Sequence, residues 1–191
     1  MDPHDYLARH IVDLPKSGIR EFFDIVSTRT GVVSLAIGEP DFDSPWHIRE
    51  AAAKSLDRGC THYTGNAGLM ELRTAIASYV KNNFGGSYDP ATEILITVGA
   101  SEGLDIALRA ILNPGDEVLY HEPCFVSYAP TIRLAHAVPV CVETRVDDEF
   151  RLTVDELEKK VTPKTKAVLL NFPCNPTGAI MEKEDLEALE K

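Results

Sequence analysis

Basic residues and long apolar runs are the scarcest features of this 191-residue sequence. It carries 19 Lys and Arg against 30 Asp and Glu, a formal net charge of −11. Binding a nucleic-acid backbone needs clustered cations that release counterions, so no nucleic-acid partner is expected. No stretch approaches the roughly 20 apolar residues that cross a bilayer, and residues 1–5 are acidic where a secretion signal is basic. We therefore expect a cytoplasmic protein without a membrane partner.

Metal-ligand and disulfide patterns are absent as well. The four cysteines form no C-x-x-C pair: Cys60, Cys124, Cys141 and Cys174. Reduced thiols are expected, in place of a zinc knuckle or a disulfide scaffold. His121 and His136 have no second ligand at a metal-like spacing, so we interpret them as ordinary rim and surface histidines and expect no metal site.

The pattern that is present, from about residue 93 onward, is an alternation of short apolar strands with helical stretches. Strands are expected at 94–98, 117–120, 138–142 and 167–171, and helices at 104–112, 125–135, 154–160 and 182–191. Such alternation requires right-handed crossovers, which predicts an α/β fold with a mostly parallel sheet and helices on both faces. The last helix has no stop signal before residue 191, so the chain is expected to be truncated.

The earlier part of the sequence predicts an arm, a short apolar run at 32–37, and two helices. The first helix is expected to have Ser44 as its N-cap and Pro45 at its first position. The second is expected from about Leu69 to Phe84, because apolar residues recur there at three-to-four spacing before two glycines.

The segment 97–104, TVGASEGL, is the sharpest local signal for chemistry. A turn of small residues between a strand and a helix points backbone N–H groups at one spot, which suits a phosphate held by Ala100 and Ser101. The same segment matches G-x-S-x-G, the nucleophile elbow of serine hydrolases, but no His-Gly-Gly run precedes it. An ordinary tight turn is the third interpretation.

Two further segments follow expected strands, at the edge where parallel α/β sheets bind their ligands. After the strand at 167–171, Asn175 has an amide that can face a ring oxygen, although the NPTG segment taken alone favours a proline-rich turn whose asparagines cap the local backbone. After the strand at 117–120, Phe125 can stack on a planar ring or pack into the core.

Five motifs in a fixed order carry a family resemblance: GEPDF at 38–42, HYT at 62–64, GASEGL at 99–104, EPCF at 122–125 and NPTG at 175–178. From about Ser17 to its end, the sequence closely resembles the class I/II aminotransferases, pyridoxal-phosphate enzymes of fold type I in the aspartate aminotransferase-like group. The resemblance implies the amino-terminal part of a three-layer α/β/α transferase fold with a mostly parallel sheet. Residues 1–45 would be the arm and the start of the small domain, and 46–191 the first part of the large cofactor-binding domain.

The resemblance also implies roles for individual residues. Gly99, Ala100 and Ser101 would receive the cofactor phosphate, Phe125 would stack on its pyridine ring, and Asn175 would hydrogen-bond the ring oxygen. Tyr63 would reach the phosphate in a neighbouring subunit, which implies a homodimer. Gly38 would lie beside the substrate carboxylate, and Ile19 would line the substrate pocket. These assignments come from the family.

The family's Schiff-base lysine has no counterpart within the 191 residues, so no catalytic residue is assigned. The implied reaction transfers an amino group from an amino acid to a 2-oxo acid, and we expect the chain alone to be inactive. Lys164 and Lys166 flank the start of an expected strand, at the edge opposite to the loops, and do not replace the missing amine. A serine hydrolase using Ser101 and a non-catalytic partner of a full-length aminotransferase remain alternatives.

Overall fold

The computed structural model describes residues 3–14, 25, 31, 38 and 40–190. The chain divides into two compact units, one made of residues 1–16 and 98–191 and the other of residues 17–97. We call the first the sheet unit and the second the helical unit. The predicted apolar run at 32–37 lies outside the described residues.

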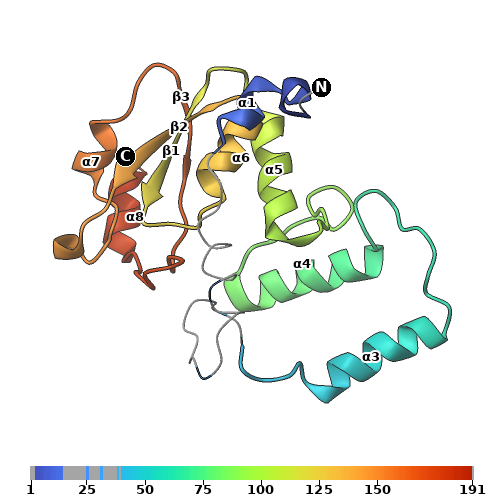
Figure 1. The fold of residues 1–191 in the computed structure, drawn as a ribbon. Helices are drawn as coiled ribbons and strands as arrows, with labels where there is room; N and C mark the ends of the chain where they lie inside the picture. Colours follow the sequence, from blue (N-terminus) through green and yellow to red (C-terminus); the bar gives the residue numbers. More distant parts are fainter. Residues whose placement is uncertain (1–2, 15–24, 26–30, 32–37, 39, 191) are drawn as a thin grey trace. The chain divides into compact units, whose positions relative to one another are not determined.

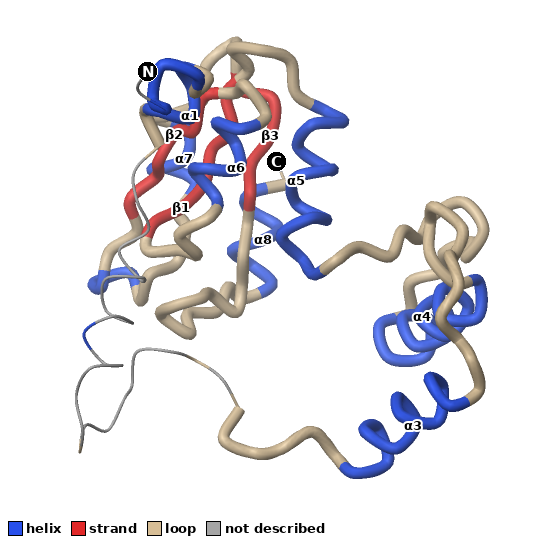
Figure 2. Tube along the Cα trace, turned by 45° about the vertical axis from the view of Figure 1, so that its right-hand side comes forward, coloured by secondary structure: helices blue, strands red, loops and turns tan. Residues whose placement is uncertain are grey.

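A parallel sheet forms the centre of the sheet unit (Figure 2). Its strands are β1 (Glu117–Glu122), β2 (Val138–Glu143) and β3 (Thr165–Leu169), in the order β2-β1-β3. Both neighbours run parallel to β1. The three expected strands at 117–120, 138–142 and 167–171 are therefore confirmed, each shifted by one or two residues at its ends, as is the α/β class.

Helices cover the two faces of this sheet (Figure 1). On one face, α5 (Gly99–Ile111) and α6 (Tyr128–Leu134) pack Leu108 and Ile132 against Val118 and Tyr120 of β1. On the other face, α7 (Val154–Glu158) and α8 (Lys183–Leu189) border a cluster around Leu119. Because successive side chains of a strand point to opposite faces, β1 contributes to both cores.

Short elements complete the sheet unit. The described residues near the start form η1 (Pro3–Tyr6) and α1 (Arg9–Val12), and η2 (Val146–Asp148) follows β2. The rings of His10 and His136 lie edge to face with centroids 4.8 Å apart, which holds the first residues against the end of α6. The peptide bonds before Pro123, Pro173 and Pro176 are cis.

The helical unit contains α3 (Trp46–Asp57) and α4 (Met70–Phe84) among its described residues. The second predicted helix is confirmed, with Leu69 as its N-cap and Gly85 as its C-cap. The first begins one residue later than predicted, because Pro45 and not Ser44 is the N-cap. Across the described part of the chain, every helix is too short or too polar to traverse a bilayer.

The predicted strand at 94–98 is wrong. Residues 94–97 have no regular secondary structure, although the Ile96 amide donates to the Ala67 carbonyl at 3.1 Å. Leu95 is half exposed and Val98 is 89% exposed, so this apolar run does not enter a core. A strand requires a partner ladder, which an apolar run by itself does not provide.

All four helices predicted in the sheet unit form but differ from the prediction at their ends, and α7 ends at Glu158, two residues before its predicted end. Helix α5 begins at Gly99, five residues before the predicted start, because the small residues of the turn themselves form its first turn. Helix α6 begins at Tyr128, so Phe125 lies in the loop before it. Helix α8 spans Lys183–Leu189, and its N-terminus carries a capping box between Glu182 and Asp185.

Candidate cofactor site

The first turn of α5 contains the predicted phosphate-binding residues. Gly99 adopts φ +77°, a left-handed conformation that favours glycine, and a Cβ built there would meet no atom within 4 Å. Ala100 and Ser101 follow it in the same turn and are exposed. The first N–H groups of a helix have no acceptor within the helix, and its N-terminus carries partial positive charge. This turn is therefore suited to an anion.

Glu102 also belongs to this turn, and its carboxylate accepts a hydrogen bond from the Val98 amide. The bond holds the chain in position just before Gly99. The negative charge of Glu102 partly offsets the positive end of the helix.

The other two predicted segments are the loops at the ends of β1 and β3. Figures 1 and 2 both show the N-terminal end of α5 at the same edge of the sheet as these loops. We call them the 123–127 loop, which contains Phe125, and the 171–178 loop, which contains Asn175. The Cys174 thiol donates to the Pro123 carbonyl, with 3.4 Å between the sulfur and the oxygen. This contact joins the two loops, as expected of strand ends in a parallel sheet.

Phe125 and Asn175 differ in how firmly they are held. The Phe125 ring is half buried and lies edge to face with Tyr128, their centroids 5.7 Å apart. Asn175 is exposed, and the turn around it is closed by the Gly178 amide, which donates to the Cys174 carbonyl at 2.8 Å. One loop thus offers a ring face and the other a solvent-facing amide.

The thiols beneath these loops are held in their neutral form. Burial raises the pKa of the Cys124 thiol to about 12 and that of Cys141 to about 11, and the Glu122 carboxylate contributes to both. Burial likewise raises the pKa of Tyr120, whose hydroxyl donates to Glu122 at 2.8 Å. Nucleophilic chemistry needs a thiolate, so neither thiol is suited to it.

His121 is the residue that the sequence interpretation missed. The sequence predicts an ordinary rim histidine, but the side chain is 1% exposed and its ring stacks on that of Phe172, with centroids 4.7 Å apart. The signal was the period of the strand: His121 follows Leu119 by two residues and so faces the same core. His136 sits at the far end of α6, beside His10.

The remaining predicted residues belong to the helical unit. Tyr63 is fully exposed, which leaves its phenol available to another molecule. Gly38 has open space where a side chain would stand. Ile19 lies outside the described residues, so the structure says nothing of it.

The hydrolase alternative finds little support in this geometry. The strand that must precede a nucleophile elbow is missing before Gly99, since residues 94–97 are irregular. The ring nitrogens of His121 are buried and accept no hydrogen bond from Ser101, so this histidine does not activate that serine. The described chain also holds no group of three or more His, Cys, Asp or Glu arranged to bind a metal ion.

Residues 30–191 match the family described as aminotransferase class I and II. The chain is 52% identical over 173 residues to an aspartate aminotransferase of Pyrococcus abyssi, covering 91% of this chain and 44% of that protein. It is 51% identical over 173 residues to aromatic-amino-acid aminotransferase 2 of Thermococcus litoralis, with the same two coverages. The crystal structure of Pyrococcus protein-A1 superposes with a TM-score of 0.91 at 51% identity, covering 94% of this chain and 46% of that one.

The parallel sheet and its structural likeness define an α/β protein of fold type I, the aspartate aminotransferase-like fold. The chain belongs to the class I and II aminotransferase family. It spans less than half the length of the relatives and the structure just described.

Proposed function

We propose that this chain is the amino-terminal portion of a pyridoxal-phosphate-dependent aminotransferase, which transfers an amino group from an amino acid to a 2-oxo acid. The single observation that carries the proposal is the meeting of the 123–127 and 171–178 loops, tied by Cys174 and Pro123, at the sheet edge where α5 begins. Family membership supplies the chemistry that these loops would serve.

The residues at this edge fit the cofactor. Gly99, Ala100 and Ser101 would bind its phosphate through backbone N–H groups and the serine hydroxyl, and their exposure leaves room for it. The face of Phe125 would orient the ring, and the Asn175 amide would donate to the ring oxygen. When bound, pyridoxal phosphate supplies an electron-withdrawing ring that stabilises negative charge on the substrate.

The helical unit would supply contacts to the substrate and to a second subunit. The full exposure of Tyr63 supports its reaching the cofactor phosphate of a partner subunit, and hence a homodimer with shared sites. Gly38 would leave space for the substrate carboxylate, with Ile19 lining the pocket. We further propose a cytoplasmic enzyme in which residues 1–45 are the arm and the start of the small domain, and 46–191 the first part of the large domain.

The donor amino acid is left open by this proposal. The relatives named for aspartate and for aromatic amino acids differ by only 1% in identity to this chain (52% and 51%), so identity favours neither. The 191-residue chain has no counterpart of the family's Schiff-base lysine. We therefore propose that this chain alone binds the cofactor noncovalently and does not transaminate.

Binding of pyridoxal phosphate to the purified chain tests the proposal. Saturable binding followed by equilibrium dialysis is expected, and Ser101→Ala should weaken it about tenfold because it removes a hydrogen bond to a charged group. Ser87→Ala, an exposed serine of the helical unit, is the matched control and should leave the affinity unchanged. No saturable binding, or equal binding by Ser101→Ala, would overturn the assignment.

Two further assays separate the alternatives. A fluorophosphonate probe should leave Ser101 unlabelled, whereas a serine hydrolase would be labelled there. Transamination by the purified 191-residue chain would contradict its proposed inactivity.

A further inference from the structure

The imidazole of His121 is the most completely buried polar side chain in the described part of the chain. It lies on β1, one residue before the strand ends, and is 1% exposed. Neither ring nitrogen makes a hydrogen bond of good geometry among the described residues, although the backbone carbonyls of Pro123 and Asn171 act on the ring. A buried polar group that is poorly paired is costly, so the position of this histidine calls for an explanation.

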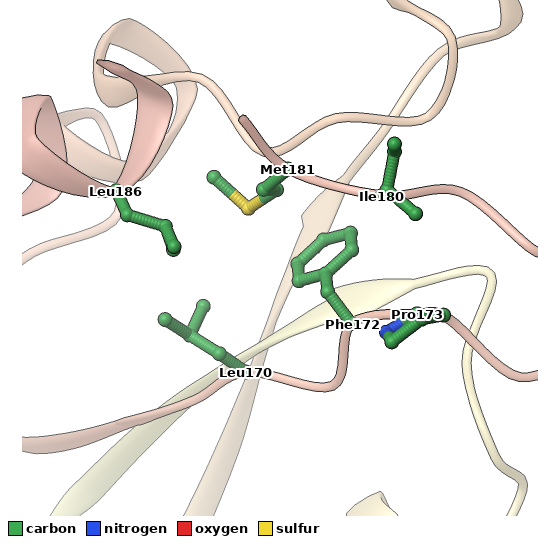
Figure 3. Close-up of a pocket in the computed structure, with 6 residues that line it drawn as sticks. All are labelled: Leu170, Phe172, Pro173, Ile180, Met181 and Leu186. Carbon is green, nitrogen blue, oxygen red and sulfur yellow. The ribbon is translucent and has the colours of Figure 1, made fainter. Parts of the chain in front are cut away.

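The ring of Phe172 stacks on the His121 imidazole. The two rings are nearly parallel, at 17°, with centroids 4.7 Å apart. Phe172 also borders an open apolar pocket of about 430 Å³ (Figure 3), lined in addition by Leu170, Pro173, Ile180, Met181 and Leu186. Because Phe172 borders open space, its stack with His121 limits where its ring can lie.

The position of Phe172 matters because Phe172 belongs to the 171–178 loop. Three residues later the same loop presents Asn175, and between them Cys174 bonds to Pro123 of the 123–127 loop. His121 itself precedes the 123–127 loop by two residues. Its ring therefore lies under the junction of the two loops that hold the proposed cofactor-binding side chains.

The surroundings of His121 favour a neutral ring. Burial lowers its pKa from the ordinary value of 6.5, and the backbone carbonyls of Pro123 and Asn171 oppose this only in part. No ionisable side chain is among the causes of the shift. The adjacent Glu122 is engaged by the Tyr120 hydroxyl, and on α8 the Asp185 carboxylate is paired with Arg151 at 3.5 Å. The hydrophobic side chains that β2, α7 and α8 contribute around Leu119 on this face of the sheet are Val140, Val142, Leu157 and Leu189.

We propose that His121 is a positioning residue: as a neutral ring it holds Phe172 and the 171–178 loop against the 123–127 loop, and its protonation in acid releases them. A charged imidazolium in this apolar cluster would need water or a counter-ion, which it can reach only if the loop moves away. The consequence for Asn175 and the cofactor rests on the proposed function, but the movement of the loop does not.

A pH titration of the isotopically labelled 191-residue chain by NMR tests the proposal. From about pH 7.5 to about pH 5, the His121 ring should titrate with a midpoint below 6.5. The amide of Gly178 and the side-chain amide of Asn175 should shift with that same midpoint. In His121→Phe, which keeps an aromatic ring but cannot be protonated, these loop signals should stay flat. His62→Gln, an exposed histidine of the helical unit, should behave as the wild type.

The outcomes separate the proposal from its rivals. A loop that does not titrate in the wild type, or one that still titrates in His121→Phe, overturns it. Should His121→Phe fail to fold, the wild type decides, because two different midpoints for the ring and the loop also overturn it. Loop titration without pyridoxal-phosphate binding would uphold this inference and refute the proposed function, and binding without loop titration would do the reverse.

Stability gives a second readout that does not depend on the loop signals. The folded chain has the lower histidine pKa, so on acidification the unfolded chain binds the proton first. The contribution of His121 to the free energy of unfolding should therefore be constant above about pH 6.5 and should decrease as the pH is lowered further. In His121→Phe this part of the fall should disappear, and its persistence at full size would contradict the assignment to His121.

Discussion

The thiol of Cys174 donates to the carbonyl of Pro123, a residue 51 positions earlier in the chain, across 3.4 Å. Cys174 is 5% exposed, so the contact is shielded from water. A thiol is a weak hydrogen-bond donor, but a shielded carbonyl that loses its partner destabilises the folded chain, because its desolvation is no longer compensated. The two loops of the candidate site are therefore joined by a hydrogen bond whose donor lies in one loop and whose acceptor lies in the other.

Replacement of Cys174 by alanine should destabilise the sheet unit. Loss of the buried sulfur and of its bond to Pro123 is expected to cost about 1–2 kcal/mol, measured by urea unfolding. Cys174→Ser keeps a donor and should cost less. Cys60→Ala removes an exposed thiol and should change the free energy of unfolding by no more than about 0.5 kcal/mol. Equal costs at Cys60 and Cys174 would contradict the importance of the Pro123 contact.

The four thiols should react with iodoacetamide at very different rates. Cys60 is exposed, whereas the pKa of Cys124 is raised to about 12 and that of Cys141 to about 11, mainly by burial. Because only the thiolate reacts, mass spectrometry of the native protein should find Cys60 modified first. Cys124 and Cys141 should be modified far more slowly than Cys60 in the native protein and rapidly only after unfolding.

A matched variant identifies the second cause of these pKa shifts. The Glu122 carboxylate raises the pKa of both Cys124 and Cys141. Glu122→Gln should therefore increase their native labelling modestly and leave that of Cys60 unchanged. Labelling of Cys124 at the rate of Cys60 in the wild type would show that burial does not protect it.

Replacement of Gly99 by alanine tests the first turn of α5. Since a Cβ at Gly99 meets nothing within 4 Å, the cost arises only from its φ of +77° and should be about 1–2 kcal/mol. Gly65→Ala is the control: it also has open space, but its φ lies outside the left-handed region. That change should be neutral or slightly stabilising in thermal unfolding. A neutral Gly99→Ala would show that this turn is not held in the left-handed conformation.

The sequence predicted elements well where a local pattern specifies them. Helix α4 could be placed from Leu69 to Phe84 because apolar spacing and a following glycine are local signals. The run at 94–98 carries an equally apolar pattern, yet it is not a strand. Pairing depends on which other segment is available, and the sequence pattern does not contain that information.

In the candidate site too, local sequence patterns predicted some features, whereas contacts between distant segments could not be predicted. The turn at Gly99 is predicted from its small residues ahead of a helix, and the loops with Phe125 and Asn175 from the rule that ligands bind beyond the ends of parallel strands. The burial of His121 could have been inferred from its spacing to Leu119. Its stack on Phe172 could not, because the contact joins segments 51 residues apart whose relative position only the folded sheet determines.

Replacement of Gly68 by alanine should be the most damaging glycine change in the described chain. Its φ is +92°, and a Cβ there would lie 2.5 Å from Cγ1 and 2.6 Å from Cβ of Ile96. Ile96 is tied to the adjacent residue, since its amide donates to the Ala67 carbonyl at 3.1 Å. The backbone must therefore shift, and we expect a loss of more than about 3 kcal/mol in the free energy of unfolding of the helical unit.

A double-mutant cycle separates the clash at Gly68 from the torsional strain. Ile96→Ala removes Cγ1 but keeps the Cβ at 2.6 Å, so Gly68→Ala should remain nearly as costly in that background. Ile96→Gly removes both atoms, and there the cost of Gly68→Ala should drop to torsional strain alone, about 1–2 kcal/mol, as at Gly99. Urea unfolding followed by a helical-unit probe, the fluorescence of Trp46, measures each arm. Full relief already in the Ile96→Ala background would show that the side chain yields and the backbone does not need to move.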